Sequence, residues 1–265
     1  MFETAIALSR DGTRIAFDRR GSGSPIIFVV GAFNERPTAA PLAESLADRF
    51  STFTYDRRGR GESGDTLLYA VEREIEDLAA LIEVAGGSAS VFGYSSGAML
   101  ALQSAAAGLP ISRLVLYDPP YLANAHDVDH TEQLAQLIAH GERGEAVEYF
   151  QSKLVGIPDA VIAQLRQAPF RPALERMAHT LVYESMLLRD RALPPAEVAS
   201  RVVMPTLALA GGAGSPILPA AATALARRLP NAKPQILPDV GHDLDTAVLG
   251  PVLAWFFGAE TEEIR

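Results

Sequence analysis

Residues 89–110 read ASVFGYSSGAMLALQSAAAGLP and predict a buried strand that turns sharply into a helix. The turn carries Gly93-Tyr94-Ser95-Ser96-Gly97, a G-x-S-x-G motif. Small residues two before and two after Ser95 let the strand and helix approach closely, while the strained turn pushes the serine oxygen out at the carboxyl edge of a sheet. This context predicts that Ser95 is a nucleophile. An ordinary Ser/Gly-rich turn is the alternative interpretation.

Outward from this turn, predicted strands and helices alternate. Apolar runs predict buried strands at residues 25–30, 51–56, 113–118 and 206–210, with helical patterns between most of them, and Asp11-Gly12 predicts a hairpin near the start. The alternation predicts an α/β fold with a mostly parallel eight-stranded sheet and helices on both faces. Residues 121–201 contain no convincing buried strand. We therefore expect a core made of residues 1–120 and 202–265, with a helical insertion at 121–201 after the sixth strand.

The bulk composition excludes several classes of protein. The chain has 265 residues, 48% of them hydrophobic, and a formal net charge of −9, so it is globular and its charge does not favour nucleic acid or an anionic membrane. It has no cysteine, which removes disulfides, thiolate metal sites and a cysteine nucleophile. We find no targeting segment and no apolar stretch of transmembrane length, so a cytoplasmic location is expected.

The sequence offers five histidines as the partner base for Ser95. The segment KPQILPDVG at 233–241 predicts the last strand and a turn. His242 follows in PDVGHDLD, where a loop would bring it over the sheet edge. A purely structural loop histidine is the alternative. The other four lie in the helical insertion: His126, His130, His140 and His179. His126 and His130 are four residues apart but lack an H-E-x-x-H pattern, which favours surface histidines over a metal site.

Together these motifs make the chain similar to serine hydrolases of the α/β-hydrolase fold, over nearly its whole length. Besides the serine turn and the late Gly241-His242, the segment YDRRGRGESG at 55–64 resembles the D-x-R-G-x-G-x-S segment after the fourth strand of that family. The resemblance implies a Ser–His–acid triad, no cofactor, no metal, and a helical lid that corresponds to 121–201. One departure is Val30-Gly31, where many members have His-Gly.

The acid of the triad is missing from its usual place. In the family it follows the seventh strand, but here residues 205–219 read PTLALAGGAGSPILP, with Gly214 or Ser215 at the expected position. We therefore predict Asp118, at the end of RLVLYDPP, because stiff prolines follow it and another carboxylate at the same edge can orient the histidine. A strand-end Asp that caps a turn is the alternative. Adjacent residues seldom present side chains to each other, which disfavours three others: Asp239, Asp243 and Asp245.

The residues around the nucleophile complete the expected site. The oxyanion donors should be the backbone N–H groups of Ser96 and of Ala32, in the loop after an earlier strand. We expect Phe33 and Tyr94 to contact the substrate, although Phe33 also fits a core aromatic. The basic cluster after residue 56 should bond loop carbonyls and Asp56 or Glu62, with a phosphate or CoA contact as the alternative: Arg57, Arg58 and Arg60.

The sequence therefore predicts a serine hydrolase acting through Ser95, His242 and Asp118 on a small to medium apolar ester, lactone or related acyl compound. Related uses of the same triad stay open, namely perhydrolysis of the haloperoxidase type, C–C bond hydrolysis, or a lyase or cyclase step. A small-molecule-binding protein without turnover is the hypothesis from another class. The sequence does not decide the oligomeric state.

Overall fold

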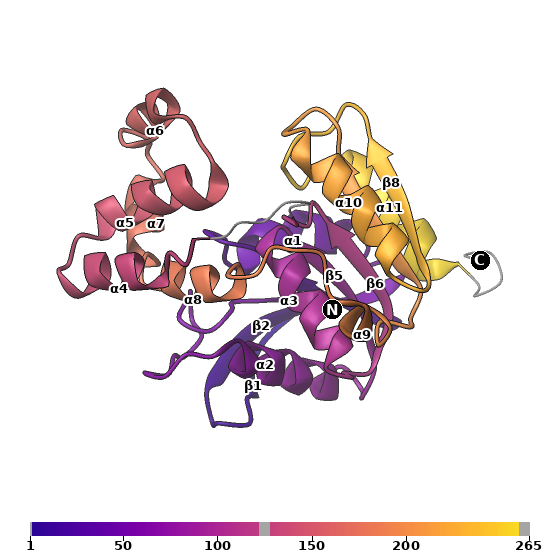
Figure 1. Cartoon of the computed structure of the whole chain (residues 1–265). Helices are drawn as coiled ribbons and strands as arrows, with labels where there is room; N and C mark the ends of the chain where they lie inside the picture. Colours follow the sequence, from indigo (N-terminus) through magenta and orange to yellow (C-terminus); the bar gives the residue numbers. More distant parts are fainter. Residues whose placement is uncertain (1, 122–127, 260–265) are drawn as a thin grey trace.

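The computed structural model describes residues 2–121 and 128–259. In these ranges one eight-stranded sheet forms the centre of the molecule, in the order β1-β2-β4-β3-β5-β6-β7-β8 (Figure 1). The pairs β1–β2 and β2–β4 are antiparallel and the remaining pairs are parallel, which confirms the predicted fold. The strands are β1 (Phe2–Leu8), β2 (Arg14–Gly21), β3 (Ser24–Val29), β4 (Phe50–Tyr55), β5 (Ala89–Tyr94), β6 (Ile111–Tyr117), β7 (Thr206–Gly211) and β8 (Ala232–Leu237).

The apolar runs are buried on both faces because helices cover both sides of the sheet. Along β3, Ile27 and Val29 pack into one hydrophobic cluster, while Ile26 and Phe28 pack into a second on the opposite face. This alternation follows from the two-residue period of a strand. On the first face lie α2 (Val71–Val84), α3 (Ser96–Ala106) and α10 (Ile217–Arg228), and on the second lie α1 (Arg36–Ser45) and α11 (Thr246–Gly258).

Between β6 and β7 the described residues form helices and no strand. In Figure 1, α4 to α7 form a group at the left of the view, apart from α10 and α11 at the right. Within this segment, α4 to α7 thus lie to one side of the sheet (Figure 1). Its elements are α4 (Thr131–Ala139), α5 (Arg143–Phe150), the π-helix η1 (Gln151–Val155), α6 (Asp159–Leu165), α7 (Arg171–Arg176), α8 (Thr180–Leu187) and α9 (Ala196–Ala199).

The parallel strands all send their carboxyl ends to one edge of the sheet. The loops after β3, β5, β6, β7 and β8 therefore meet there, which is where α/β proteins build their sites. Within the described ranges, no helix has both the length and the apolar character needed to span a bilayer.

Candidate active site

Ser95 occupies a strained turn between β5 and α3. Its backbone angles are φ 57° and ψ −128°, a conformation that L-residues rarely adopt. The turn is tight because a Cβ at Gly93 would lie 2.6 Å from Cα of Ala98, and one at Gly97 would lie 2.2 Å from the Val29 oxygen. These two glycines explain why the motif needs small residues on both sides of the serine.

Asp118 and His242 meet beside this turn. Oδ2 of Asp118 lies 2.7 Å from Nδ1 of His242, and the aspartate side chain is fully buried whereas the histidine side chain is 41% exposed. Asp118 follows β6 directly and has a positive φ of 49°. Its Oδ1 accepts the backbone N–H of Gly211 at 2.9 Å. Both carboxylate oxygens are therefore bonded, which fixes the orientation of the carboxylate toward the histidine.

The end of β7 contributes a backbone N–H group to the site, and the loop after it contributes no acid. Gly211 supplies the N–H that binds Asp118, and a Cβ on Gly211 would lie only 2.4 Å from the Gly241 oxygen and 2.6 Å from the Val240 oxygen. Glycine is thus required for the histidine loop to pass this close to the end of β7. The absence of an acid in residues 212–216 leaves Asp118, on the neighbouring strand, as the carboxylate that reaches His242.

Two tyrosines hold the backbone of the histidine loop. The Tyr94 hydroxyl donates to the His242 oxygen at 2.8 Å, and the Tyr117 hydroxyl lies 2.9 Å from the Gly241 oxygen and 3.0 Å from the Asp243 oxygen. Burial, followed by the charges of Asp118 and Asp243, raises the pKa of Tyr94, so its hydroxyl keeps its proton as a donor.

Tyr94 was expected to contact the substrate, but the structure gives it different neighbours. It is buried, it does not line the cavity at Ser95, and its ring centroid lies 4.9 Å from that of His242. Strand β5 sends alternate side chains to opposite faces, and Tyr94 packs into the cluster beneath the histidine loop. Tyr94 therefore supports the histidine from below.

The loop after β3 lies against the first residue of α3. The Ala32 N–H donates to Oγ of Ser96 at 2.9 Å, and both residues line the cavity at Ser95. Phe33 has a positive φ of 61° and packs edge-on against Phe150, with ring centroids 5.4 Å apart. Phe150 lines the cavity, so Phe33 forms the layer behind it.

A buried network of arginines and glutamates supports the loop after β3. Arg60 donates to the oxygens of Gly31 at 2.7 Å and Asn34 at 3.2 Å, and it also pairs with Glu184 of α8. Arg57 is fully buried and joins Glu184 at 2.5 Å and Glu74 at 2.6 Å. Burial raises the pKa of the Glu74 carboxyl, but the charge of Arg57 and its hydrogen bonds lower it further, so the net shift is downward.

This network decides between the two interpretations of the basic cluster. Arg57, Arg58 and Arg60 are all buried and bonded inside the protein, so they do not offer a phosphate or CoA contact at the surface. The expected bonds to loop carbonyls are present. The expected acid partners are wrong, because Asp56 and Glu62 pair with Arg36. The acids that the three arginines meet come from elsewhere in the chain: Asp11, Glu74, Asp77 and Glu184. Glu184 was missed, although a single acid within the apolar run TLVYESMLL is a signal that could have drawn attention to it.

The cavity at the sheet edge has a volume of about 270 Å³. The structure brings Ser95, His242, Ala32 and Ser96 to this one cavity, where Asp118 binds His242 from behind. Most of the lining is apolar, and it comes from the helical segment and α10. The residues concerned are Pro120, Phe150, Leu154, Val155, Leu188, Ile217 and Leu218, with Ser215 and Arg191 adding polar groups.

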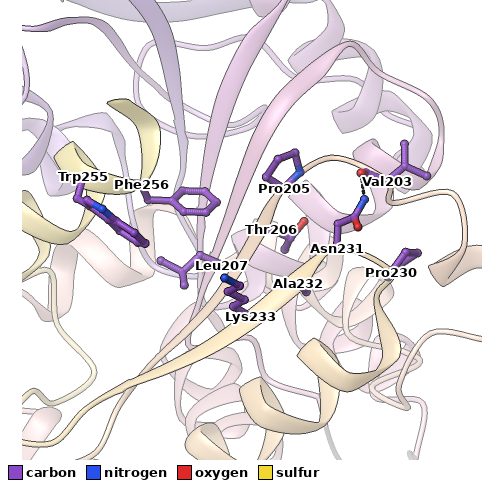
Figure 2. Close-up of a pocket in the computed structure, with 10 residues that line it drawn as sticks. All are labelled: Val203, Pro205, Thr206, Leu207, Pro230, Asn231, Ala232, Lys233, Trp255 and Phe256. Carbon is purple, nitrogen blue, oxygen red and sulfur yellow. Dashed lines mark hydrogen bonds between the residues drawn. The ribbon is translucent and has the colours of Figure 1, made fainter. Parts of the chain in front are cut away.

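A larger cavity of about 470 Å³ lies at the opposite ends of β7 and β8 (Figure 2). Thr206 and Leu207 line it where β7 begins, and Trp255 and Phe256 of α11 face them. Among the described residues that line it there is no serine, histidine or carboxylate, so it lacks the groups that the chemistry of a hydrolase needs.

The remaining histidines belong to the helical segment. His130 bonds the Tyr149 hydroxyl at 2.8 Å, and His126 lies outside the described residues. In the part of the chain that is described, no cluster of three His, Asp or Glu side chains could hold a metal ion.

Comparisons with known proteins identify the family and the fold of this chain. Residues 26–249 match the family model described as the alpha/beta hydrolase family. The crystal structure of an alpha/beta hydrolase from Sphaerobacter thermophilus DSM 20745 superposes with a TM-score of 0.89 at 46% identity, over 96% of this chain and 100% of that chain.

Two relatives by sequence have more specific names. N-formylmaleamate deformylase of Pseudomonas putida is 37% identical over 118 residues, which span 43% of this chain and 44% of the deformylase, so the match covers less than half of that relative. The 2-(acetamidomethylene)succinate hydrolase of Mesorhizobium japonicum is 28% identical over 241 residues, 84% of this chain and 83% of that protein.

Proposed function

The chain belongs to the alpha/beta hydrolase family, and on that premise we propose that it is a serine hydrolase that uses Ser95, His242 and Asp118. The observation that carries the proposal is the 2.7 Å contact between Asp118 and His242, at the edge of a cavity that Ser95 and His242 both line. A nucleophile on a strained turn, a histidine and a buried orienting carboxylate are the three parts that acyl transfer requires.

The proposed reaction proceeds in two halves. Oγ of Ser95 attacks the carbonyl carbon and its proton passes to Nε2 of His242, while Asp118 accepts the Nδ1 hydrogen bond and stabilises the imidazolium. The tetrahedral intermediate then collapses, the leaving alcohol takes that proton, and an acyl-enzyme remains. Water then attacks the acyl group while His242 takes its proton. His242 returns this proton to Oγ of Ser95 as the second tetrahedral intermediate collapses, which releases the carboxylic acid and restores free Ser95.

The oxyanion would form beside the start of α3. The backbone N–H of Ser96 belongs to the first turn of this helix, where N–H groups lack intrahelical partners and the helix dipole is positive. Ala32, in the loop after β3, lines the same cavity and faces this helix start. Preorganised donors of this kind account for a large share of catalysis in acyl transfer.

The cavity supports a small and mainly apolar substrate. Its volume of about 270 Å³ and its Leu, Ile, Val and Phe lining favour the acyl part of a small ester or lactone. We propose that the helical segment between β6 and β7 acts as the lid of the site, because Phe150, Leu154 and Leu188 come from it. Two ion pairs join this segment to the core, from Glu184 of α8 to Arg57 and to Arg60.

Labelling of Ser95 with a fluorophosphonate probe, followed by a panel of p-nitrophenyl esters, tests the proposal. We expect covalent labelling at Ser95, located by mass spectrometry, and hydrolysis of short-chain esters with a burst of acyl-enzyme. Ser95→Ala should abolish both labelling and burst. A wild-type protein that binds acyl ligands tightly but shows neither labelling nor turnover would favour the binding-protein hypothesis instead.

A carboxylate-bearing substrate is a second candidate, favoured by Arg191. Among the described lining residues, Arg191 and His242 are the ionisable ones. Nη1 of Arg191 donates to the Leu154 oxygen at 3.0 Å, which holds the side chain at the cavity wall, and a guanidinium has five N–H donors and pairs strongly with carboxylates. The deformylase and the succinate hydrolase carry the names of carboxylate compounds. If this candidate holds, Arg191→Gln should raise KM for a p-nitrophenyl hemisuccinate by about tenfold or more. KM for p-nitrophenyl butyrate should stay unchanged.

A further inference from the structure

The contact between Ala32 and Ser96 involves two groups expected at the oxyanion. The Ala32 N–H donates to Oγ of Ser96 at 2.9 Å, which is a normal hydrogen-bond length. Ser96 is only 2% exposed, yet it lines the cavity beside Ser95. The N-cap of α3 is Ser95, so Ser96 occupies the first helical position and its hydroxyl does not serve as the cap of this helix.

The backbone around Ala32 is held in this position from two sides. A Cβ on Gly31 would lie 2.9 Å from Cβ of Ser95 and 3.0 Å from Oγ of Ser96, so the loop lies as close to α3 as a glycine permits. On its other side, Arg60 binds the Gly31 oxygen at 2.7 Å. The Ala32 N–H is therefore directed at Ser96 by the fold.

An amide has one proton to donate, whereas a hydroxyl can accept one hydrogen bond and donate another at the same time. We infer that the Ser96 hydroxyl is a side-chain oxyanion donor, and that the Ala32 N–H acts through it. A hydroxyl that accepts a hydrogen bond becomes polarised and is a better donor. This inference rests on the proposed serine-hydrolase function. It gives Ser96 two donors to the oxyanion, its backbone N–H and its Oγ–H.

No bond to Ser96 forms or breaks in this arrangement. Its proton stays on Oγ through both halves of the reaction, and the proton in transit is the one that passes from Ser95 to His242 and on to the leaving group. The residue acts on the transition state, because negative charge develops on the carbonyl oxygen as the tetrahedral intermediate forms.

The competing arrangement has the Ser96 hydroxyl turn aside so that the Ala32 N–H binds the oxyanion directly. The two arrangements predict opposite effects of Ser96→Ala. If the Ser96 hydroxyl is the donor, its removal destabilises the transition state and lowers kcat. If Ser96 merely occupies the Ala32 N–H in the resting enzyme, its removal frees a donor, and kcat is unchanged or rises.

The experiment measures kcat and KM for an ester and for the matched thionoester, in which sulfur replaces the carbonyl oxygen and accepts hydrogen bonds poorly. The variants are Ser96→Ala, which removes the hydroxyl, Ser96→Cys, which keeps its shape with a weak donor, and Ser96→Thr, which keeps the hydroxyl. Loss of one oxyanion donor costs on the order of 10²-fold in kcat. Because Ser96→Ala leaves the Ala32 N–H nearby, we expect a loss of about tenfold or more.

Support consists of three results together. Ser96→Ala and Ser96→Cys lower kcat for the ester with KM nearly constant, their preference for ester over thionoester falls by a similar factor, and Ser96→Thr keeps the preference. A Ser96→Ala enzyme with unchanged or higher kcat overturns the inference, as does an equal loss on both substrates. Wild-type activity and probe labelling separate the outcomes: if they are present, only the role of Ser96 fails, and if they are absent, the proposed function fails with it.

Discussion

The backbone N–H of Gly211 donates to Oδ1 of Asp118 at 2.9 Å, while Oδ2 of the same carboxylate lies 2.7 Å from Nδ1 of His242. The end of β7 therefore takes part in the site, although the loop after it carries no acid. Gly211, the last residue of β7, orients the carboxylate of Asp118, which follows the neighbouring strand β6. A side chain at that residue would collide with the backbone of the histidine loop, so one glycine serves both contacts.

Asp118→Asn should leave the fold intact and lower turnover strongly. The amide can still accept the Gly211 N–H, but it cannot hold the histidine in the tautomer that accepts the serine proton. Neutralising the acid of a triad costs on the order of 10⁴-fold in kcat, and we expect that scale here. Steady-state hydrolysis of a short p-nitrophenyl ester measures it, with the thermal midpoint as the check on folding.

Asp243→Asn is the matched control, because Asp243 follows His242 directly but is exposed. It should keep most of the activity. Near-normal turnover by Asp118→Asn, or a larger loss in Asp243→Asn, would assign the acid elsewhere.

Local patterns predicted the sheet, and together with the resemblance to the α/β hydrolases they predicted that Ser95, Asp118 and His242 lie at one of its edges. Strands and helices follow from hydrophobic period, and parallel strands bring their carboxyl ends together. Contacts between distant segments carry no such pattern. The bond from Arg57 to Glu184 joins residues 127 positions apart, and that from Ala32 to Ser96 joins residues 64 apart. The hydroxyl of Tyr94 binds the histidine loop because its side chain lies on the second face of the sheet, beneath that loop. The spacing of the motif does not encode this placement.

Ser95→Gly should be more stable than Ser95→Ala, although both lack a nucleophile. Ser95 has φ 57°, where a side chain with a Cβ stores strain of about 1–3 kcal/mol. Glycine removes that strain but gains entropy in the unfolded chain, so the net advantage over alanine should be about 1 kcal/mol. Chemical denaturation of the two variants measures the difference. Equal stability would mean that the turn stores no strain.

Glu184→Gln should destabilise the protein strongly. Glu184 is fully buried and faces both Arg57 and Arg60. A neutral amide in its place removes the negative charge that balances these two buried guanidinium groups. Breaking a buried pair in this way costs about 3 kcal/mol or more in the free energy of unfolding. Because Arg60 also binds the Gly31 oxygen, kcat should fall as well.

The exposed pair between Arg189 and Asp129 provides the comparison for Glu184. Asp129→Asn should cost less than about 1 kcal/mol, the usual value of a surface ion pair. If the two variants cost the same, the buried network does not contribute the stability assigned to it.

The protein should lose stability as the pH falls through the range below about 6.5, in part through His179. Burial lowers the pKa of His179; Asp65 opposes this shift and Arg143 adds to it. Nδ1 of His179 lies 3.1 Å from a guanidinium nitrogen of Arg143, a contact that needs the unprotonated ring nitrogen. The unfolded chain therefore binds a proton at higher pH than the folded one, so stability is full above the unfolded pKa and declines as pH drops toward the folded pKa.

Denaturant titrations at pH 7.5 and 5.5 measure the contribution of His179. The wild type should lose more unfolding free energy between these values than His179→Gln, which carries no titratable ring. An identical loss in both proteins would show that His179 does not contribute to the pH dependence.

Gly211→Ala and Gly214→Ala are a matched pair of variants that tests how closely the end of β7 and the loop after it must approach the histidine loop. A Cβ at Gly211 would lie 2.4 Å from the Gly241 oxygen, so the histidine loop must move, whereas the nearest atom to a Cβ at Gly214 is the His242 nitrogen at 3.7 Å, an ordinary contact. Overpacking against backbone costs about 1–3 kcal/mol, and a displacement of about 1 Å at a catalytic group can cost 10²-fold in rate. We therefore expect Gly211→Ala to lower both the thermal midpoint and kcat, with KM less affected, and Gly214→Ala to resemble the wild type.

Equal activity of the two variants would mean that the close approach of β7 to the histidine loop does not position His242. A loss in Gly214→Ala alone would locate the sensitive contact farther along the loop, beside the cavity.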